Sequence, residues 1–152
     1  MPPSTEIRDF LHKHLQAIFD SDLPTYHATT VEHLTLYEWY VTPHRIDGIP
    51  FHDFQMSEVG RSDTTSTPLV SDRQGLPQKP RTRFDLANYV EQRYGDTAIA
   101  SYTLLISQGT EKGIRVHSYN ESRVLVKFTD GWKVVHVHKS PSWNAPFQPA
   151  PG

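Results

Sequence analysis

Large apolar residues among the first twenty positions recur every three or four residues. They are Ile7, Phe10, Leu11, Leu15, Ile18 and Phe19. Because an α-helix turns once in about 3.6 residues, this spacing predicts an amphipathic helix over residues 5–20 that packs against another part of the protein. The polar residues 20–22 end it. Residues 23–26 predict a short helical turn, since proline is tolerated in a first turn after an aspartate cap.

The middle of the chain carries several patterns. Residues 31–41 are rich in aromatic and β-branched side chains, which indicates a short strand or an ordered aromatic loop. Asp47 and Gly48 predict a turn, and residues 50–59 predict a further helix. Residues 60–80 contain three prolines, repeated serines and threonines and few large apolar groups, so they bury little surface. We therefore expect an extended, flexible loop there.

The second half of the chain consists of β-rich runs separated by turn residues. The runs cover residues 83–93, 97–107, 114–119, 123–129 and 132–138. The separators are Gly95-Asp96, the segment 108–113, Asn120-Glu121 and Asp130-Gly131. Helices followed by an antiparallel meander are typical of an α+β fold with its helices on one face of the sheet.

Asp130 and Gly131 form the strongest hairpin signal, because a tight two-residue turn needs positive φ at its central positions. A turn centred on this pair predicts the register of both strands. One side then pairs Thr129 with Trp132, Lys127 with Val134, Leu125 with His136 and Arg123 with His138. The other side pairs Val124 with Val137 and Val126 with Val135, and it is plainly apolar.

The first side of this hairpin is either a solvated surface or the wall of a cavity with a polar end. Leu125 and Trp132 lie on it and favour burial, and a buried Arg123 needs an anionic partner. We therefore interpret this side as a cavity wall with Arg123 as its anion anchor.

Length and composition limit the classes of protein. The 152 residues suit one domain, residues 1–152, with one layered core. The absence of cysteine excludes a disulfide scaffold, a thiol nucleophile and cysteine-bearing zinc sites. Fifteen Lys and Arg against 17 Asp and Glu give a net charge of −2, which disfavours nucleic acid or an acidic membrane as a partner. No apolar run is long enough to span a bilayer, so we expect a soluble cytoplasmic protein.

Nine histidines raise the question of a metal site. His136 and His138 are two residues apart on a predicted strand, so they point to the same side, as a metal pair would. A zinc site needs a third protein ligand, and no His-x-x-x-His or Glu-x-x-His motif supplies one. We expect neither a metal nor a cofactor.

Two segments resemble one protein family. Residues 120–140, NESRVLVKFTDGWKVVHVHKS, are similar to the closing strands of the calcium/calmodulin-dependent protein kinase II association domain, or hub domain, with its Glu-Thr-Arg-Val segment, Asp-Gly-Lys-Trp turn and Val-His-Phe-His-Arg-Ser strand. Residues 35–54, TLYEWYVTPHRIDGIPFHDF, resemble its Thr-Ala-Phe-Glu segment and its later Glu-Gly-Leu-Asp-Phe-His-Arg-Phe helix, at the same interval. No glycine-rich nucleotide loop or kinase catalytic-loop signature accompanies them, so the chain resembles the association module alone.

The resemblance implies the cone-shaped α+β fold of the nuclear-transport-factor-two-like superfamily, with N-terminal helices packed in a curved antiparallel sheet. It also implies assembly into a homodimer or larger ring, and cavity arginines that hold a small carboxylate. Arg123 matches one of these arginines, and Lys139 stands where the family has a second. A third would fall within residues 103–105, where no arginine occurs. We therefore expect a less cationic cavity than the family's.

Two functions are compatible with these residues. The first is a non-catalytic association module whose cavity binds a small organic acid. Its candidate ligand residues are Arg123, His138, Lys139, Glu38, Tyr37 and His136. The second is a ketosteroid-isomerase-like or polyketide-cyclase-like enzyme that uses Glu38 and His138 in the same cavity.

Glu38 is the residue that separates these two functions. It is either a surface carboxylate or a cavity group, and in the cavity it is either paired with Arg123 or a general base. An arginine beside it would keep it ionised and weakly basic, which favours binding over catalysis. For His52 we expect a packing role on its predicted helix. In the proline-rich tail, residues 141–152, we expect Trp143 and Phe147 to dock locally or on a neighbouring subunit.

Overall fold

The structure is a computed structural model that describes residues 4–62, 70–71, 77–78, 82–142 and 146. Its helices are α1 (Glu6–Phe19), α2 (Leu23–Thr29) and α3 (Pro50–Ser62). Its strands are β1 (Thr30–Glu38), β2 (Ile46–Asp47), β3 (Val70–Ser71), β4 (Pro77–Gln78), β5 (Thr82–Tyr94), β6 (Thr97–Thr110), β7 (Gly113–Phe128) and β8 (Gly131–Pro141). The α+β class that the sequence predicts is confirmed.

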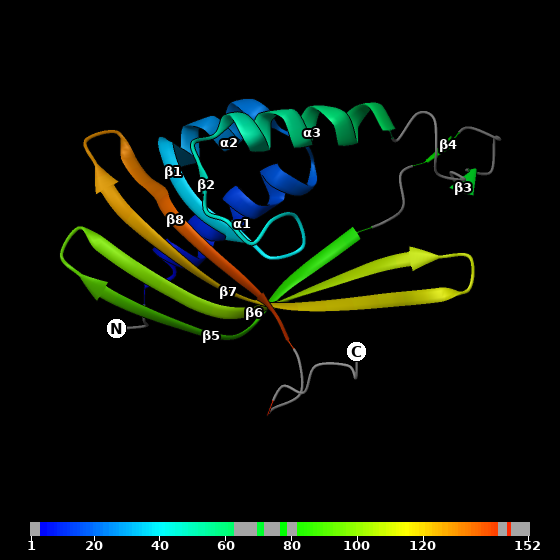
Figure 1. Cartoon of the computed structure of the whole chain (residues 1–152). Coiled ribbons are helices and arrows are strands. Elements are labelled where there is room, and N and C mark those ends of the chain that lie inside the picture. The colour runs from blue at the N-terminus through cyan, green and yellow to red at the C-terminus, as the bar shows by residue number, and fades with distance from the viewer. Residues whose placement is uncertain (1–3, 63–69, 72–76, 79–81, 143–145, 147–152) are drawn as a thin grey trace.

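Six of these strands form a strongly curved sheet in the order β2-β1-β8-β7-β6-β5. Helices α1, α2 and α3 lie on its inner side (Figure 1). Strands β5 to β8 form the predicted antiparallel meander. Strand β1 runs parallel to β8, however, so the sheet is mixed. This long-range pairing brings the end of β1 beside the end of β8, where the candidate site lies.

Helix α1 buries the apolar stripe that its sequence predicts. Ile7, Leu11 and Leu15 are at most 2% exposed and belong to the same core as Val134 of β8. Burying a large apolar side chain stabilises a fold by about 1.5–3 kcal/mol. His14 lies on the same stripe and is also buried, so this helix carries a polar ring into the core, where it needs hydrogen-bond partners.

Strand β7 is a single strand of 16 residues, and the turn predicted at Asn120-Glu121 does not exist. Glu121, Arg123 and Leu125 are all buried on the inner face, at alternating positions. Asn120 and Glu121 lie in the middle of a strand because the Glu121 side chain is buried inside the protein. A turn signal based on polarity alone is misleading there.

The hairpin between β7 and β8 closes in a different register from the predicted one. Phe128 pairs with Gly131, so Thr129 and Asp130 form the turn. Gly131 has φ +120°, a conformation that is open only to glycine. Glycine therefore serves as the first paired residue of β8 and not as a central turn residue.

The register shifts again where Val124 pairs with His136 and Leu125 pairs with Val134, because Val135 forms a bulge in β8. Arg123 then faces Val137, so the prediction that Arg123 and His138 converge is wrong. The prediction of a purely apolar second side is also wrong, because Val124 faces His136 on the outer face. A bulge depends on the whole sheet, so the turn sequence cannot reveal it.

The predicted loop at 60–80 and the tail lie largely outside the described residues. Within that loop range α3 continues to Ser62, and β3 pairs with β4. Trp143 and Phe147 fall outside the described residues, so their expected docking is not tested. None of the described helices is both long enough and apolar enough to cross a membrane.

Candidate functional site

The sheet separates the candidate ligand residues into two groups. In the parallel pairing of β1 with β8, Tyr37 lies beside His138 and Glu38 lies beside Lys139. Successive strand residues point to opposite faces, so Glu38 points inward and Tyr37 points outward. The Tyr37 ring centroid is 5.0 Å from that of His138 and 6.3 Å from that of His136. The inner group is Glu38, Lys139 and Arg123, and the outer group is Tyr37, His136 and His138.

A cavity of about 320 Å³ lies on the inner side of the sheet. Its walls are mostly apolar and aromatic, and come from Leu15, Ile18, Phe19, Trp39, Tyr40, Leu104, Ile106 and Tyr119. Its ionisable residues other than tyrosine are Glu121, Arg123 and Lys139. A hollow with apolar walls and a few convergent polar groups is the usual form of a small-molecule site.

Arg123 organises a buried hydrogen-bond network at this polar end. Its Nε donates to the Tyr102 hydroxyl at 2.9 Å, and its Nη2 donates to Glu121 Oε1 at 3.4 Å. The Tyr102 hydroxyl donates to the same Glu121 oxygen at 2.8 Å. All three residues are at most 4% exposed. The anionic partner that a buried arginine needs is therefore Glu121, two residues earlier on β7.

His14 extends the network to helix α1. The Thr29 hydroxyl donates to the backbone carbonyl of Thr25 at 2.9 Å, so it accepts a hydrogen bond from His14 Nδ1, 2.8 Å away. The other ring nitrogen, Nε2, is then unprotonated and accepts from Arg123 Nη1 at 3.2 Å. Burial, together with the positive charge of Arg123, holds the pKa of His14 well below its ordinary value. His14 is therefore a neutral acceptor in this network.

Glu38 lies at the centre of a second buried network. Its Oε1 accepts from His52 Nε2 at 3.0 Å and from Lys139 Nζ at 2.7 Å. The Tyr26 hydroxyl is hydrogen-bonded to His52 Nδ1 and joins α2 to α3. His52, expected to pack, is buried and also makes these two polar contacts. The alternative in which Glu38 pairs with Arg123 is wrong, because Glu38 pairs with Lys139.

The electrostatics of Glu38 follow from these contacts. Burial alone would raise its pKa, but the hydrogen bonds and charges of His52 and Lys139 outweigh burial and lower the pKa to about 2. The second oxygen, Oε2, is buried and meets no hydrogen-bond partner among the described residues. Burial and the nearby Glu38 carboxylate raise the pKa of the Tyr40 hydroxyl, which stays neutral. Glu38 is a firmly ionised carboxylate and a weak base.

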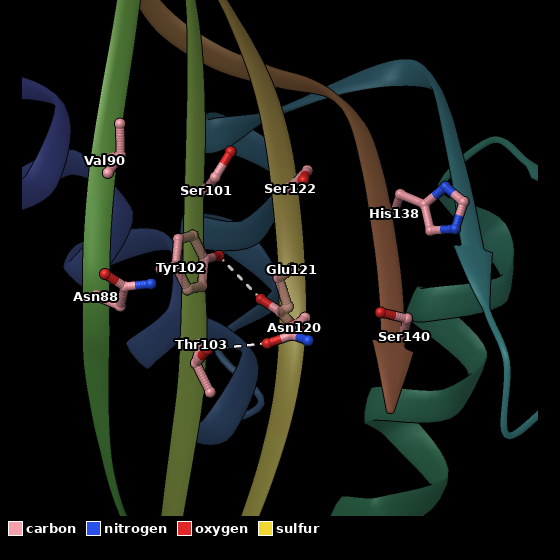
Figure 2. Close-up of a pocket in the computed structure, with 10 residues that line it drawn as sticks. All are labelled: Asn88, Val90, Ser101, Tyr102, Thr103, Asn120, Glu121, Ser122, His138 and Ser140. Carbon is pink, nitrogen blue, oxygen red and sulfur yellow. Dashed lines mark hydrogen bonds between the residues drawn. The ribbon is translucent and has the colours of Figure 1, made fainter. Parts of the chain in front are cut away.

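A second hollow, of about 310 Å³, lies over strands β5 to β8 (Figure 2). Ser101, Ser122 and His138 line it from the outer face. Tyr102 and Glu121 also contribute to its lining. Figure 2 shows the hydrogen bond that joins these last two residues across β6 and β7. Glu121 therefore lines both the inner cavity and this second hollow.

Reasoning from the sequence missed three residues of the inner site, namely His14, Tyr102 and Glu121. His14 occupies the same helical face as Leu11 and Leu15, and a histidine on an apolar stripe is a detectable signal of a buried polar contact. Glu121 lies two residues before Arg123, which is the spacing that places both side chains on one face of a strand. Neither Tyr102 nor its neighbours in the sequence carry such a signal.

Comparisons with known proteins agree with the resemblance described above. A family model described as the calcium/calmodulin dependent protein kinase II association domain matches residues 3–69 and 72–143. No curated protein matches the chain.

Several solved structures share the fold. The CaMKII hub homology domain of Chlamydomonas reinhardtii matches with a TM-score of 0.73 and 23% identity, over 91% of this chain and 98% of that one. The association domain of C. elegans CaMKII matches with a TM-score of 0.70 and 25% identity, over 90% and 93%. A nuclear transport factor 2 (NTF2-like) superfamily protein from Salmonella enterica matches with a TM-score of 0.62 and 18% identity, over 93% and 92%.

Proposed function

Because the chain belongs to the calcium/calmodulin dependent protein kinase II association-domain family, we propose that it is an association module without kinase activity of its own. In this proposal it assembles with copies of itself through the outer face of its sheet, and its inner cavity binds a small organic acid. The observation that carries the first part is the uncovered outer face. The second part rests on the cations at the polar end of the cavity.

The outer face of the sheet is suited to association. All three helices lie on the opposite side (Figure 1). Ile99 and Val124 pair across β6 and β7 on the outer face and are only half-buried, while Val116 and Ile114, further along β7, are 58% and 77% exposed. Exposed apolar side chains on a sheet face that no helix covers mark an interaction surface. A second copy covers it with a matching face under two-fold symmetry.

A charge placed on this face tests the association surface. In Val124→Glu, a carboxylate would lose its hydration in a sheet-to-sheet contact, so we expect smaller particles by size-exclusion chromatography with light scattering. Ser57→Glu adds the same charge at an exposed position of α3 and serves as the control. The proposal predicts an unchanged mass for the control. Equal masses for the two variants and the wild type would show that the outer face is not the association surface.

The ligand proposal rests on N–H donors of Arg123 and Lys139 that the contacts described above leave unused. The contacts described above use three of the five N–H donors of the guanidinium group, which leaves two for a ligand oxygen. Lys139 also lines the cavity, and its Nζ donates to Glu38. The apolar and aromatic walls can hold the carbon body of a small acid. A planar carboxylate suits the arginine fork better than a lysine.

Calorimetric titration with benzoate tests this ligand class. Arg123→Lys keeps the charge that Glu121 requires but loses the fork, so we expect benzoate to bind about tenfold more weakly. Arg45→Lys, at an exposed pair with Asp47, is the matched control. A wild type that binds no carboxylate, or an Arg123→Lys variant that binds as tightly as the wild type, would refute the acid-binding part.

The enzymatic alternative has less support. Glu38 and His138, the pair suggested for it, lie on opposite faces of the sheet and cannot act on one substrate. With a pKa of about 2, Glu38 is a poor proton acceptor at neutral pH. Both observations favour binding over catalysis in the inner cavity.

A further inference from the structure

The polar end of the inner cavity is balanced in charge before any ligand binds. Arg123 Nη2 contacts Glu121 Oε1 at 3.4 Å, and Lys139 Nζ contacts Glu38 Oε1 at 2.7 Å. The two carboxylate side chains are 2% and 1% exposed, and the two cationic side chains are 2% and 14% exposed. Each pair joins one positive and one negative charge in a nearly dry space, and His52, the other partner of Glu38, is hydrogen-bonded through Nδ1 to the Tyr26 hydroxyl. An added carboxylate ion would bring one uncompensated negative charge into it, which is costly.

The groups that face Glu121 supply no spare positive charge. Tyr102 approaches it from β6 and Arg123 from β7, while Lys139 lies opposite it on β8. Burial raises the pKa of the Tyr102 hydroxyl, which therefore stays neutral. On α1, the neutral ring of His14 accepts a hydrogen bond from Arg123. Tyr40 and Tyr119 also line the cavity, and Glu38 lies beside Lys139 with His52 of α3 as its second partner.

We propose, on the basis of the acid-binding function above, that Glu121 sets the charge of the ligand, so that a small acid enters the cavity together with one proton. The proton comes from solvent, or with the acid itself, and the ligand carboxylate and Glu121 share it. The pair of carboxylates then carries a single negative charge, opposite Arg123, as Glu121 alone does in the empty site.

Titration of the wild type with benzoate near neutral pH tests this coupling directly. Measurements in buffers of different ionisation enthalpy report the number of protons taken up, and we expect about one proton per benzoate. We also expect the affinity to fall about tenfold for each unit of pH increase near neutrality. Benzamide, the neutral analogue, should bind without proton uptake. These measurements need no variant, so they do not depend on how a substitution folds.

Glu121→Gln provides the second test. Glutamine keeps an oxygen that accepts from Tyr102 and Arg123, but it leaves Arg123 with an uncompensated positive charge. Benzoate should then bind as the anion, with no proton uptake and at least tenfold more tightly at pH about 7. Benzamide binding should not change. Glu111→Gln, at the exposed turn between β6 and β7, should behave as the wild type.

The outcomes separate this inference from the function on which it rests. Benzoate binding by the wild type without proton uptake would overturn the role of Glu121 and leave the acid-binding function intact. Proton uptake that persists in Glu121→Gln would also overturn that role. Absence of benzoate binding to the wild type would overturn the acid-binding function and this inference together, but not the association proposal.

Discussion

Replacing Lys139 by methionine removes one of the two partners of a carboxylate that is almost completely buried. Glu38 accepts hydrogen bonds from Lys139 and His52, and its pKa falls from 4.5 to about 2 in the folded protein. That difference corresponds to about 3 kcal/mol of stability at neutral pH, shared between the two partners. Removing one partner of a buried ion pair costs about 3–5 kcal/mol when no water replaces it. Because the Lys139 side chain is 14% exposed, we expect about 2–3 kcal/mol for Lys139→Met.

Urea denaturation at one fixed protomer concentration measures this cost, since assembly makes apparent stability depend on concentration. Lys133→Met is the matched control on the same strand, because its pair with Asp130 is exposed and contributes less than about 1 kcal/mol. The double variant Lys139→Met/Glu38→Gln should be more stable than Lys139→Met, since it leaves no unpaired charge inside. Equal losses for Lys139→Met and Lys133→Met would refute the reasoning.

The pH dependence of the free energy of unfolding provides an independent test. The depressed pKa of Glu38 stabilises the fold fully above its ordinary value of 4.5, and this stabilisation is lost as the pH falls towards about 2. The difference in stability between wild type and Lys139→Met should therefore shrink over that interval. A difference that stays constant down to the lower limit would mean that Glu38 is not the group involved.

Two further predictions concern backbone strain and the buried histidine. Gly131 has φ +120° and Gly95 has φ +61°, and no atom lies near an added Cβ at either site. We therefore expect Gly131→Ala to lower the free energy of unfolding by about 1–3 kcal/mol, and by more than Gly95→Ala, in urea denaturation. Equal losses for the two variants would contradict the turn geometry. His14 has a pKa depressed by burial, so the unfolded chain binds its proton more readily and stability is lost as the pH falls below 6.5. His14→Asn should show a smaller loss between that pH and about 5, whereas identical slopes would show that His14 does not titrate on unfolding.

Local periodicity predicts the elements that depend on neighbouring residues. The stripe of Ile7, Leu11 and Leu15 predicts α1, and alternation predicts most of the meander, because both patterns lie within one element. Strand β7 shows the limit of such reasoning. The polar residues Asn120 and Glu121 look like a turn, yet Glu121 belongs to a buried network that only the folded protein reveals.

The candidate site could be predicted only in part, for reasons of geometry. Glu38 pairs with Lys139 because β1 runs parallel to β8, and the two residues are 101 positions apart in the chain. The extra residue of β8, Val135, places Val137 and not His138 opposite Arg123, and no turn sequence encodes it. The sequence and its family resemblance predict Glu38, Arg123 and Lys139 as cavity residues. They do not separate these residues from Tyr37, His136 and His138 on the outer face, because the separation depends on tertiary pairing.

The mass of the wild-type protein in solution tests the association proposal most directly. Multi-angle light scattering at micromolar concentration should give an integral multiple of the chain mass of 17.4 kDa, corresponding to a dimer or a larger ring. A mass near 17.4 kDa at that concentration would contradict the account.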